Sequence, residues 1–251
     1  AKSFIKCNFL ITFATMDFSS ELQVLSSYIE RAEKVVVITH MHPDGDAAGS
    51  TAALAHYLQD FRHKNVSLIR EPLPDTISFI DEHFTPVSGD KAREVLKEAD
   101  LIFCTDFGVL DRCGEYAREL AESKAIKVLA DHHPEPQAEA FDLLFSSSEL
   151  SSASEIVYQL LKGLCRDEEE RKALLGGACG YALMCGMTTD TNNFSCSTFP
   201  STLMMASELL AYGINRDEIL EKLYNRYREN RVRAFASILS ENFSIREDGS
   251  G

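Results

Sequence analysis

Aspartate and histidine side chains directly follow three short apolar runs of this sequence, and a further aspartate ends a fourth apolar stretch. The run 35–39 is followed by His-x-x-x-Asp-x-Asp, the run 101–105 by one aspartate, and the run 126–130 by Asp-His-His. The fourth segment is Thr-Thr-Asp-Thr at 188–191. Such side chains bind metal ions and transfer protons, so their grouping predicts metal-dependent chemistry. The residues are His40, Asp44, Asp46, Asp106, Asp131, His132, His133 and Asp190.

Each of these residues alone has an ordinary explanation. An aspartate at the start of a predicted helix, such as Asp44 or Asp46, is a common helix cap. Asp106 and Asp190 could be loop or turn acids, and the two adjacent histidines could lie on the surface. The combined pattern after three strand ends is hard to reach by chance, which favours one functional site.

The charge of this set indicates what it binds. Asp44, Asp46, Asp106 and Asp190 would bring four negative charges together, and the motifs contain no lysine or arginine. Neighbouring carboxylates cannot all stay ionised without compensation, and two divalent cations would balance them. Oxygen ligands with an imidazole suit Mn²⁺, with Mg²⁺, Fe²⁺ or Co²⁺ as rivals, whereas zinc would lack the sulfur ligands it favours.

A parallel sheet would place these side chains at one edge. Apolar runs at 35–39, 66–70, 101–105, 126–130 and 141–145 alternate with helical patterns at 22–32, 48–61 and 113–123. This alternation predicts an α/β fold in which a parallel five-stranded sheet is flanked by helices. The carboxyl ends of parallel strands lie on one edge, where ligands bind near the switch in strand order.

Helices are expected to follow the last strand. The spacing of apolar residues predicts helices over 154–165, 171–187 and 201–212, with Gly176 and Gly177 marking a kink or close packing in the second. Asn215 is predicted to cap another helix, whose pattern is interrupted at Arg231.

Composition restricts the partners of the chain. The net charge is −14 over 251 residues, which argues against binding long duplex DNA or anionic membrane surfaces. No apolar run is long enough to span a bilayer, so no membrane association is expected. The seven cysteines are scattered, which is typical of reduced thiols and predicts a cytoplasmic protein.

The sequence resembles the DHH phosphoesterase superfamily. It is most similar to the branch of bacterial short-oligoribonucleotide hydrolases that also act as phosphatases on 3′-phosphoadenosine 5′-phosphate (pAp). The family commonly has glycine where this chain has Asn192, which tolerates a positive φ better than most residues. The motifs that carry the resemblance are Thr39-His40…Pro43-Asp44-Gly45-Asp46…Gly49-Ser50, Thr105-Asp106, Asp131-His132-His133 and Thr189-Asp190-Thr191…Phe194.

The resemblance implies a role for each site residue. His40, Asp44 and Asp106 would hold one metal ion. A second ion would be held by Asp46, Asp106, His132 and Asp190, so that Asp106 bridges the two. His133 would face the scissile phosphate, and Asp131 would orient an imidazole. His42, His56, His63 and His83 match no ligand position.

The resemblance also divides the chain into parts. Residues 1–18 would be an N-terminal extension, 19–195 the catalytic domain, and 196–240 a helical region with a connecting helix. Residues 241–251 would begin a C-terminal substrate-binding (DHHA1-type) domain that is otherwise missing, with a first strand at 242–246. Arginines at 226, 228, 231 and 233 would lie on a solvated face or contact a phosphate or a partner subunit.

The predicted function is therefore a metal-dependent phosphoesterase. It would hydrolyse short oligoribonucleotides, pAp or both through a water activated by two metal ions, and a homodimer is left open. The alternatives are a cyclic or linear dinucleotide phosphodiesterase and a truncated module that binds metal or nucleotide without turnover. Pyrophosphate is a less favoured substrate.

Overall fold

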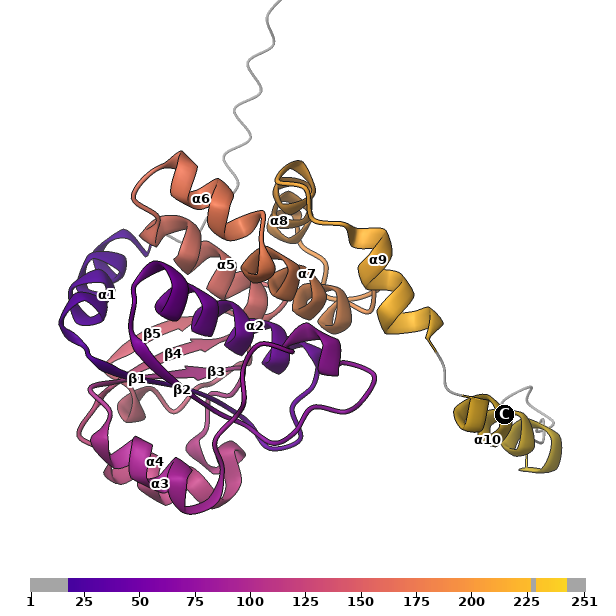
Figure 1. The fold of residues 1–251 in the computed structure, drawn as a ribbon, viewed down its shortest axis with the longest axis horizontal. Coiled ribbons are helices and arrows are strands. Elements are labelled where there is room, and N and C mark those ends of the chain that lie inside the picture. Colours follow the sequence, from indigo (N-terminus) through magenta and orange to yellow (C-terminus); the bar gives the residue numbers. More distant parts are fainter. Residues whose placement is uncertain (1–17, 227–228, 243–251) are drawn as a thin grey trace, which may run out of the picture. The chain divides into compact units, whose positions relative to one another are not determined.

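The computed structural model describes residues 18–226 and 229–242, and its centre is one parallel sheet (Figure 1). The strand order is β2-β1-β3-β4-β5, and each neighbouring pair is parallel. The predicted fold class is confirmed, and each predicted strand is present with bounds shifted by no more than two residues. The strands are β1 (Lys34–Thr39), β2 (Asn65–Ile69), β3 (Leu101–Thr105), β4 (Ile126–Asp131) and β5 (Leu143–Ser146).

Helices cover both faces of this sheet. The helices α1 (Ser19–Arg31), α2 (Gly45–His56) and α5 (Ala153–Leu164) lie on one face, and α3 (Gly89–Glu98) and α4 (Ala117–Glu122) on the other (Figure 1). All five residues of β3 are buried, as expected of a central parallel strand whose residues are β-branched or apolar.

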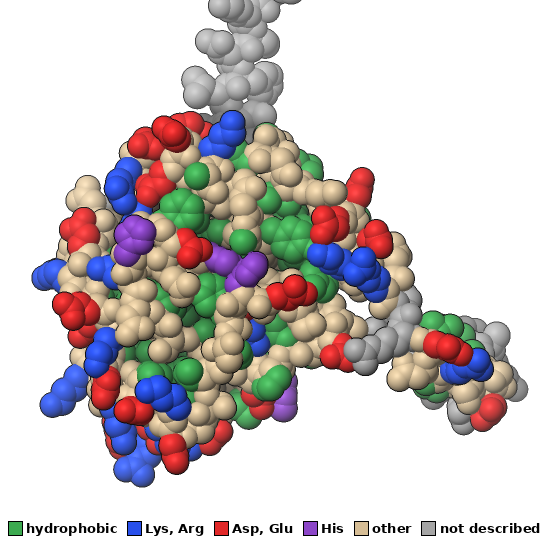
Figure 2. Space-filling model, in the orientation of Figure 1, with side chains coloured by type: hydrophobic (Ala, Val, Ile, Leu, Met, Phe, Trp, Pro, Cys, Tyr) green, Lys and Arg blue, Asp and Glu red, His purple; other side chains and the backbone are tan. Residues whose placement is uncertain are grey.

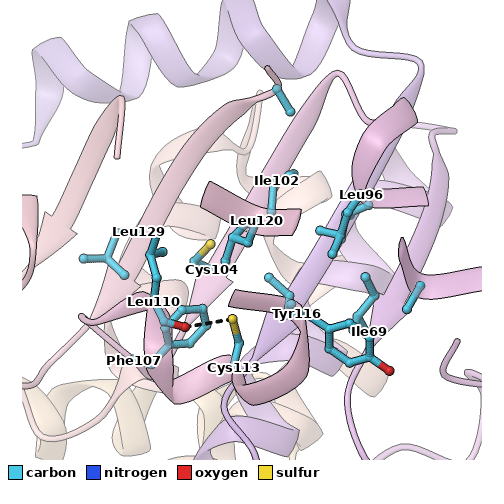
Figure 3. Packing of buried hydrophobic residues seen from close by; sticks show 14 of the residues in the cluster. Ile69, Leu96, Ile102, Cys104, Phe107, Leu110, Cys113, Tyr116, Leu120 and Leu129 are labelled. Carbon is cyan, nitrogen blue, oxygen red and sulfur yellow. Dashed lines mark hydrogen bonds between the residues drawn. The ribbon is translucent and has the colours of Figure 1, made fainter. Parts of the chain in front are cut away.

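The core beneath α3 and α4 fixes the loop that follows β3. Ile102 and Cys104 of β3 pack with Leu120 of α4 and with Phe107, which is only 1% exposed (Figure 3). In the same cluster the Cys113 thiol donates a hydrogen bond to the Leu110 carbonyl oxygen. The chain after β3 is therefore anchored by packing rather than left as a free loop.

A second helical layer lies over α2 and α5. It contains α6 (Glu168–Leu175), α7 (Ala178–Asp190) and α8 (Pro200–Ala211). The single helix predicted over 171–187 is in fact two helices, because Gly177 adopts an extended conformation (φ −112°, ψ −152°). The second of them, α7, packs along α2.

Residues Asn215–Gly251 form a separate compact unit, with Ala1–Ile214 as the other. Asn215 caps the helix α9 (Arg216–Leu220) by accepting a hydrogen bond from the backbone N–H of Glu218, as predicted. A π-helical turn, Glu221–Asn225, follows, and α10 (Glu229–Ser237) comes after it. The spacing of apolar residues is interrupted at Arg231, but the helix is not: α10 continues through this residue.

Two of the predicted divisions of the chain fall at or beyond the ends of the described residues. The predicted extension at 1–18 lies outside the described residues except for Phe18. Asn242 ends a π-helical turn that begins at Ile238, and the remaining residues of the predicted strand 242–246 lie outside the described part. The division at 195/196 remains a prediction, since the compact units divide at Ile214 instead.

One helix was absent from the sequence-based expectations. The helix α3 is strongly polar and buries only Ala92 and Leu96.

Across the described residues, no helix has both the length and the apolar character needed to cross a bilayer.

Candidate metal centre

The strand register places the chemistry-bearing residues side by side. Thr39 of β1 pairs with Thr105 of β3, which in turn pairs with Ala130 of β4. The residues that come next, His40, Asp106 and Asp131, therefore lie at the same level of the sheet. The strand order 2-1-3-4-5 reverses between β1 and β3, so this is the switch point at which open α/β sheets bind ligands.

Hydrogen bonding determines which nitrogen of His40 faces the cluster. His40 Nδ1 lies 2.8 Å from the Met41 carbonyl oxygen, which can only accept, so Nδ1 carries the hydrogen. In a neutral imidazole, Nε2 is then a lone pair directed at Asp106 Oδ2, 3.3 Å away. Two facing acceptors repel each other unless a proton or a metal ion lies between them, so this pair suits a cation.

Asp44 both caps a helix and belongs to the cluster. Its Oδ1 atom accepts hydrogen bonds from the backbone N–H groups of Asp46 and Ala47, each at 3.0 Å, at the start of α2. The ordinary explanation of this aspartate as a helix cap is thus correct, but the cap uses only one oxygen. Ligand atoms of His40, Asp44 and Asp106 lie within 4.8 Å of one another, so the second oxygen is available to a shared ion.

Asp46 is held by the start of another helix. Its two carboxylate oxygens accept hydrogen bonds from the backbone N–H groups of Ala153 (2.6 Å) and Ser154 (2.9 Å) in the first turn of α5. These N–H groups have no partner within their own helix, and the positive end of the helix dipole favours an anion there. Asp46 is 1% exposed, so α5 fixes the position of this predicted ligand.

The two histidines after β4 have different surroundings. Burial lowers the pKa of His132, whose Nε2 lies 3.7 Å from Asp106 and 3.5 Å from Asp190. His133 Nδ1 lies 2.7 Å from the buried carboxylate of Asp131, and this hydrogen bond raises the pKa of His133. The side chain of His133 is 40% exposed, so its other nitrogen can meet a bound molecule.

Asp190 reaches the cluster from the last residue of α7. Ligand atoms of Asp46, His132 and Asp190 lie within 4.8 Å of one another and form a second group beside that of His40. The backbone after Asp190 is tightly turned: Asn192 has φ 43° and Phe194 has φ 66°. The positive φ expected of Asn192 is therefore observed.

The structure brings all eight predicted site residues to one place. Asp106 Oδ1 also lies 3.7 Å from both His132 Nε2 and His133 Nδ1, so Asp106 is central to the set. The space-filling view shows histidine and acidic side chains close together near the middle of one face (Figure 2). The ligand and catalytic roles of these residues stay predictions, and none of the four other histidines joins a ligand group among the described residues.

Burial and mutual repulsion make it unfavourable for the carboxylates of the cluster to be ionised together without a cation. Burial and then the charge of Asp190 raise the pKa of Asp46 to about 7. Burial and then the neighbouring Asp44 raise the pKa of Asp190 to about 6, and burial with the charge of Asp46 raises that of Asp106 well above its ordinary value. Oxygen ligands with one imidazole per group match a pair of divalent ions such as Mn²⁺.

Without metal, the protein is expected to become less stable as pH rises from about 5 to 8. Asp46 and Asp190 bind protons in the folded state at pH values where the unfolded chain has released them, so the free energy of unfolding falls with pH. The lowered pKa of His132 opposes this, but for one proton only. A loss of about 2 kcal/mol corresponds to roughly 4–8 °C in Tm for a chain of this size.

Thermal unfolding measured by circular dichroism at pH 5.5, 6.5 and 8, with EDTA or with Mn²⁺, tests this expectation. Mn²⁺ should raise Tm most at pH 8, where the carboxylates are free of protons. A metal-free Tm that climbs steadily from pH 5.5 to 8 would contradict it.

Two features near the site were not found from the sequence. Ser151 and Ser152 are fully buried immediately before α5, whose first turn holds Asp46. The segment after Asp106 also borders the site: the Met41 N–H donates to the Arg112 carbonyl oxygen (2.9 Å), next to His40. Neither carries a sequence signal, because both depend on contacts between segments far apart in the chain.

The fold and the cluster together define a class of protein. It is an α/β protein with a parallel sheet, in which carboxylates and imidazoles gather at the switch point to form a candidate metal centre. Family comparison agrees with this assignment, since the model of the DHH family, N-terminal domain, matches residues 34–187. The chain belongs to the DHH family, whose members are phosphoesterase hydrolases.

Three relatives show where in the family the similarity lies. The chain is 27% identical over 221 residues to the Bacillus subtilis protein named bifunctional oligoribonuclease and PAP phosphatase NrnA, covering 87% of this chain and 65% of that protein. It is 25% identical over 197 residues to a probable manganese-dependent inorganic pyrophosphatase of Streptococcus agalactiae, covering 74% and 58%. The crystal structure of an exopolyphosphatase-related protein from Bacteroides fragilis superimposes with a TM-score of 0.82 at 32% identity, covering 91% and 67%.

Proposed function

We propose that this protein is a Mn²⁺-dependent phosphoesterase that hydrolyses short oligoribonucleotides and pAp. The single observation that carries the proposal is the pair of ligand groups, His40 with Asp44 and Asp106, and Asp46 with His132 and Asp190. Similarity to the Bacillus subtilis relative, whose name gives both activities, supports the choice of substrate. The chain spans 58–65% of the length of these curated relatives, and the proposal concerns the chemistry of the part present.

Two divalent ions bound in these groups would supply an activated water and neutralise charge on the phosphoryl oxygens. The protein's own contribution begins with Asp106, which lies between the two groups and would bridge them. Asp44 and Asp46 are held by backbone N–H groups of α2 and α5, so they need little rearrangement to act as ligands.

His133 would act on the substrate itself. Asp131 is fully buried, accepts the Nδ1–H of His133 and favours its charged form, which leaves Nε2–H free to donate. We assign this hydrogen to a phosphoryl oxygen or to the departing oxygen of the ester. Asp131 would then orient His133 and favour its charged form.

A panel of substrates assayed with Mn²⁺ tests the proposal. The panel contains pAp, 5′-phosphorylated ribonucleotides of two to five units, cyclic di-AMP and pyrophosphate. We expect turnover of pAp and of the short ribonucleotides, with kcat/KM at least about tenfold above that for cyclic di-AMP and pyrophosphate, a margin of roughly 1.4 kcal/mol in transition-state binding.

Two other results would each replace this proposal. Faster hydrolysis of cyclic di-AMP than of any other member would identify a cyclic dinucleotide phosphodiesterase. Binding of Mn²⁺ and pAp with no hydrolysis of any member would identify a binding module without turnover.

A further inference from the structure

A cavity opens next to the candidate metal centre, on the side of His133. Its volume is about 550 Å³, within the range of small-molecule sites and larger than a lone phosphate or pyrophosphate needs. The side chain of His133 forms part of its wall, so a molecule whose scissile phosphate meets the metal centre would extend into it. The lining residues are Gly108, Val109, Asp111, Arg112, His133 and Pro134.

The cavity is built from a segment that is fixed to the site. A Cβ atom on Gly108 would lie 2.8 Å from Asp131 Oδ2, so this backbone rests directly against the carboxylate that holds His133. At the other end, Gly114 has φ 59°, and a Cβ there would lie 2.5 Å from Met41 Sδ. The lining of the cavity is therefore positioned by the same residues that position His40 and His133.

Arg112 brings an available positive charge to this otherwise acidic place. Its side chain is exposed and makes no ion pair or hydrogen bond within the described part of the chain. Other arginines are engaged: Arg62 pairs with Glu170, and Arg93 pairs with Glu115. Arg112 and His133 line the same cavity, so both side chains can meet one bound molecule.

The remaining walls fit a nucleoside. Val109, which is 44% exposed, and Pro134 offer apolar surface on which a base or a ribose can lie. The Asp111 carboxylate is an acceptor, which suits a ribose hydroxyl or a base amino group. A guanidinium is the side chain best shaped to grip a phosphate with two parallel hydrogen bonds.

We propose that this cavity binds the nucleoside attached to the scissile phosphate, and that Arg112 contacts a second phosphate on that nucleoside. The inference rests on the proposed function and adds a specificity determinant to it. It predicts that the enzyme selects nucleotides with two phosphates, such as a nucleoside 3′,5′-bisphosphate, over nucleotides with only the phosphate to be removed.

The test compares pAp with adenosine 3′-monophosphate, which has the same 3′-phosphate but lacks the second one. In Arg112→Gln, the ratio of kcat/KM for pAp to that for the monophosphate should fall about 10- to 100-fold, the worth of a hydrogen bond to a charged group. Most of the loss should be in KM. Arg112→Lys should restore part of the ratio, because it keeps the charge without the planar fork.

A binding measurement provides a second readout. Adenosine 5′-monophosphate, which keeps the second phosphate, should bind the Mn²⁺-loaded protein more weakly by a similar factor in Arg112→Gln. Arg118→Gln is the matched control, since Arg118 is 81% exposed on α4 and pairs with Glu122 outside the cavity. It should leave both the ratio and the binding unchanged.

The outcomes separate this inference from the proposed function. An unchanged ratio in Arg112→Gln, or equal losses for both substrates, would overturn the role of Arg112 while leaving the phosphoesterase intact. If the unaltered protein hydrolyses neither compound, the proposed function fails first. In that case unchanged binding of adenosine 5′-monophosphate in Arg112→Gln would also overturn the inference.

Discussion

Replacing Asp106 by asparagine is expected to lower Mn²⁺-dependent phosphoester hydrolysis more than about 100-fold. Loss of a residue that only supports a metal ligand typically costs about 10- to 100-fold, so the loss of a shared ligand should exceed that range. Asp106 lies 3.3 Å from His40 Nε2 and 3.7 Å from His132 Nε2, so it lies between the two ligand groups. An amide has nearly the same shape but no charge and one fewer acceptor, so it cannot bridge two cations. The measurement is kcat/KM on pAp at saturating Mn²⁺.

Asparagine is chosen at this position because the fold should survive it. Asp106 has φ 64°, a conformation that asparagine adopts readily and alanine does not. Its pKa is raised well above the ordinary value by burial and by neighbouring carboxylates, so this carboxyl group destabilises the metal-free protein increasingly as pH rises above that ordinary value. The variant should therefore melt at a higher temperature than the unaltered protein at pH 8 in EDTA.

The matched control for this substitution is Asp90→Asn. Asp90 is an exposed acid in the first turn of α3, so its replacement removes the same charge away from the cluster. It should retain hydrolysis within about twofold, as surface substitutions usually change little. Retention of more than a tenth of the activity by Asp106→Asn would show that Asp106 is not the central ligand.

Replacing Gly49 by alanine is expected to destabilise the protein by about 1–3 kcal/mol and to weaken Mn²⁺ binding more than tenfold. A Cβ atom there would lie 2.5 Å from the Ala182 carbonyl oxygen and 3.0 Å from the backbone of Gly186. These are backbone atoms of α7, which cannot rotate away, so α2 and α7 would have to separate. Asp46 lies on α2 and Asp190 on α7, so the second ligand group would open.

Urea unfolding in EDTA and a Mn²⁺ titration measure the two effects of Gly49→Ala. Alanine favours a helix by up to about 1 kcal/mol over glycine, so a net loss would show that contact outweighs propensity. Gly163→Ala in α5 is the control, because its Cβ would meet only the end of the flexible Leu22 side chain, at 2.7 Å. It should bind Mn²⁺ normally, and equal behaviour of the two variants would contradict the close-packing argument.

The features that follow from local residue types could be predicted from the sequence. The β-branched and apolar runs 35–39 and 101–105 are typical of buried strands, and a parallel sheet then places His40 and Asp106 together. The cap that Asp44 forms at the start of α2 could be predicted in the same way, because an aspartate directly before a helix commonly accepts hydrogen bonds from its first N–H groups.

Other features depend on tertiary contacts that no local pattern records. The anchoring of Asp46 by Ala153 and Ser154 joins segments more than a hundred positions apart, so nothing near Asp46 could indicate it. The predicted single helix through Gly176 and Gly177 was broken because two adjacent glycines let the chain turn. The segment that lines the cavity beside Arg112 is likewise held by a distant contact, in which the Met41 N–H donates to the Arg112 carbonyl oxygen.

The proposed phosphoesterase chemistry depends on a centre that binds two metal ions through one shared aspartate. The most direct measurement is the number of Mn²⁺ ions bound per chain at pH 8, determined by isothermal titration together with electron paramagnetic resonance. We expect two magnetically coupled ions per chain in the unaltered protein, and no more than one in Asp106→Asn. A single uncoupled ion in the unaltered protein, or two ions in both proteins, would contradict it.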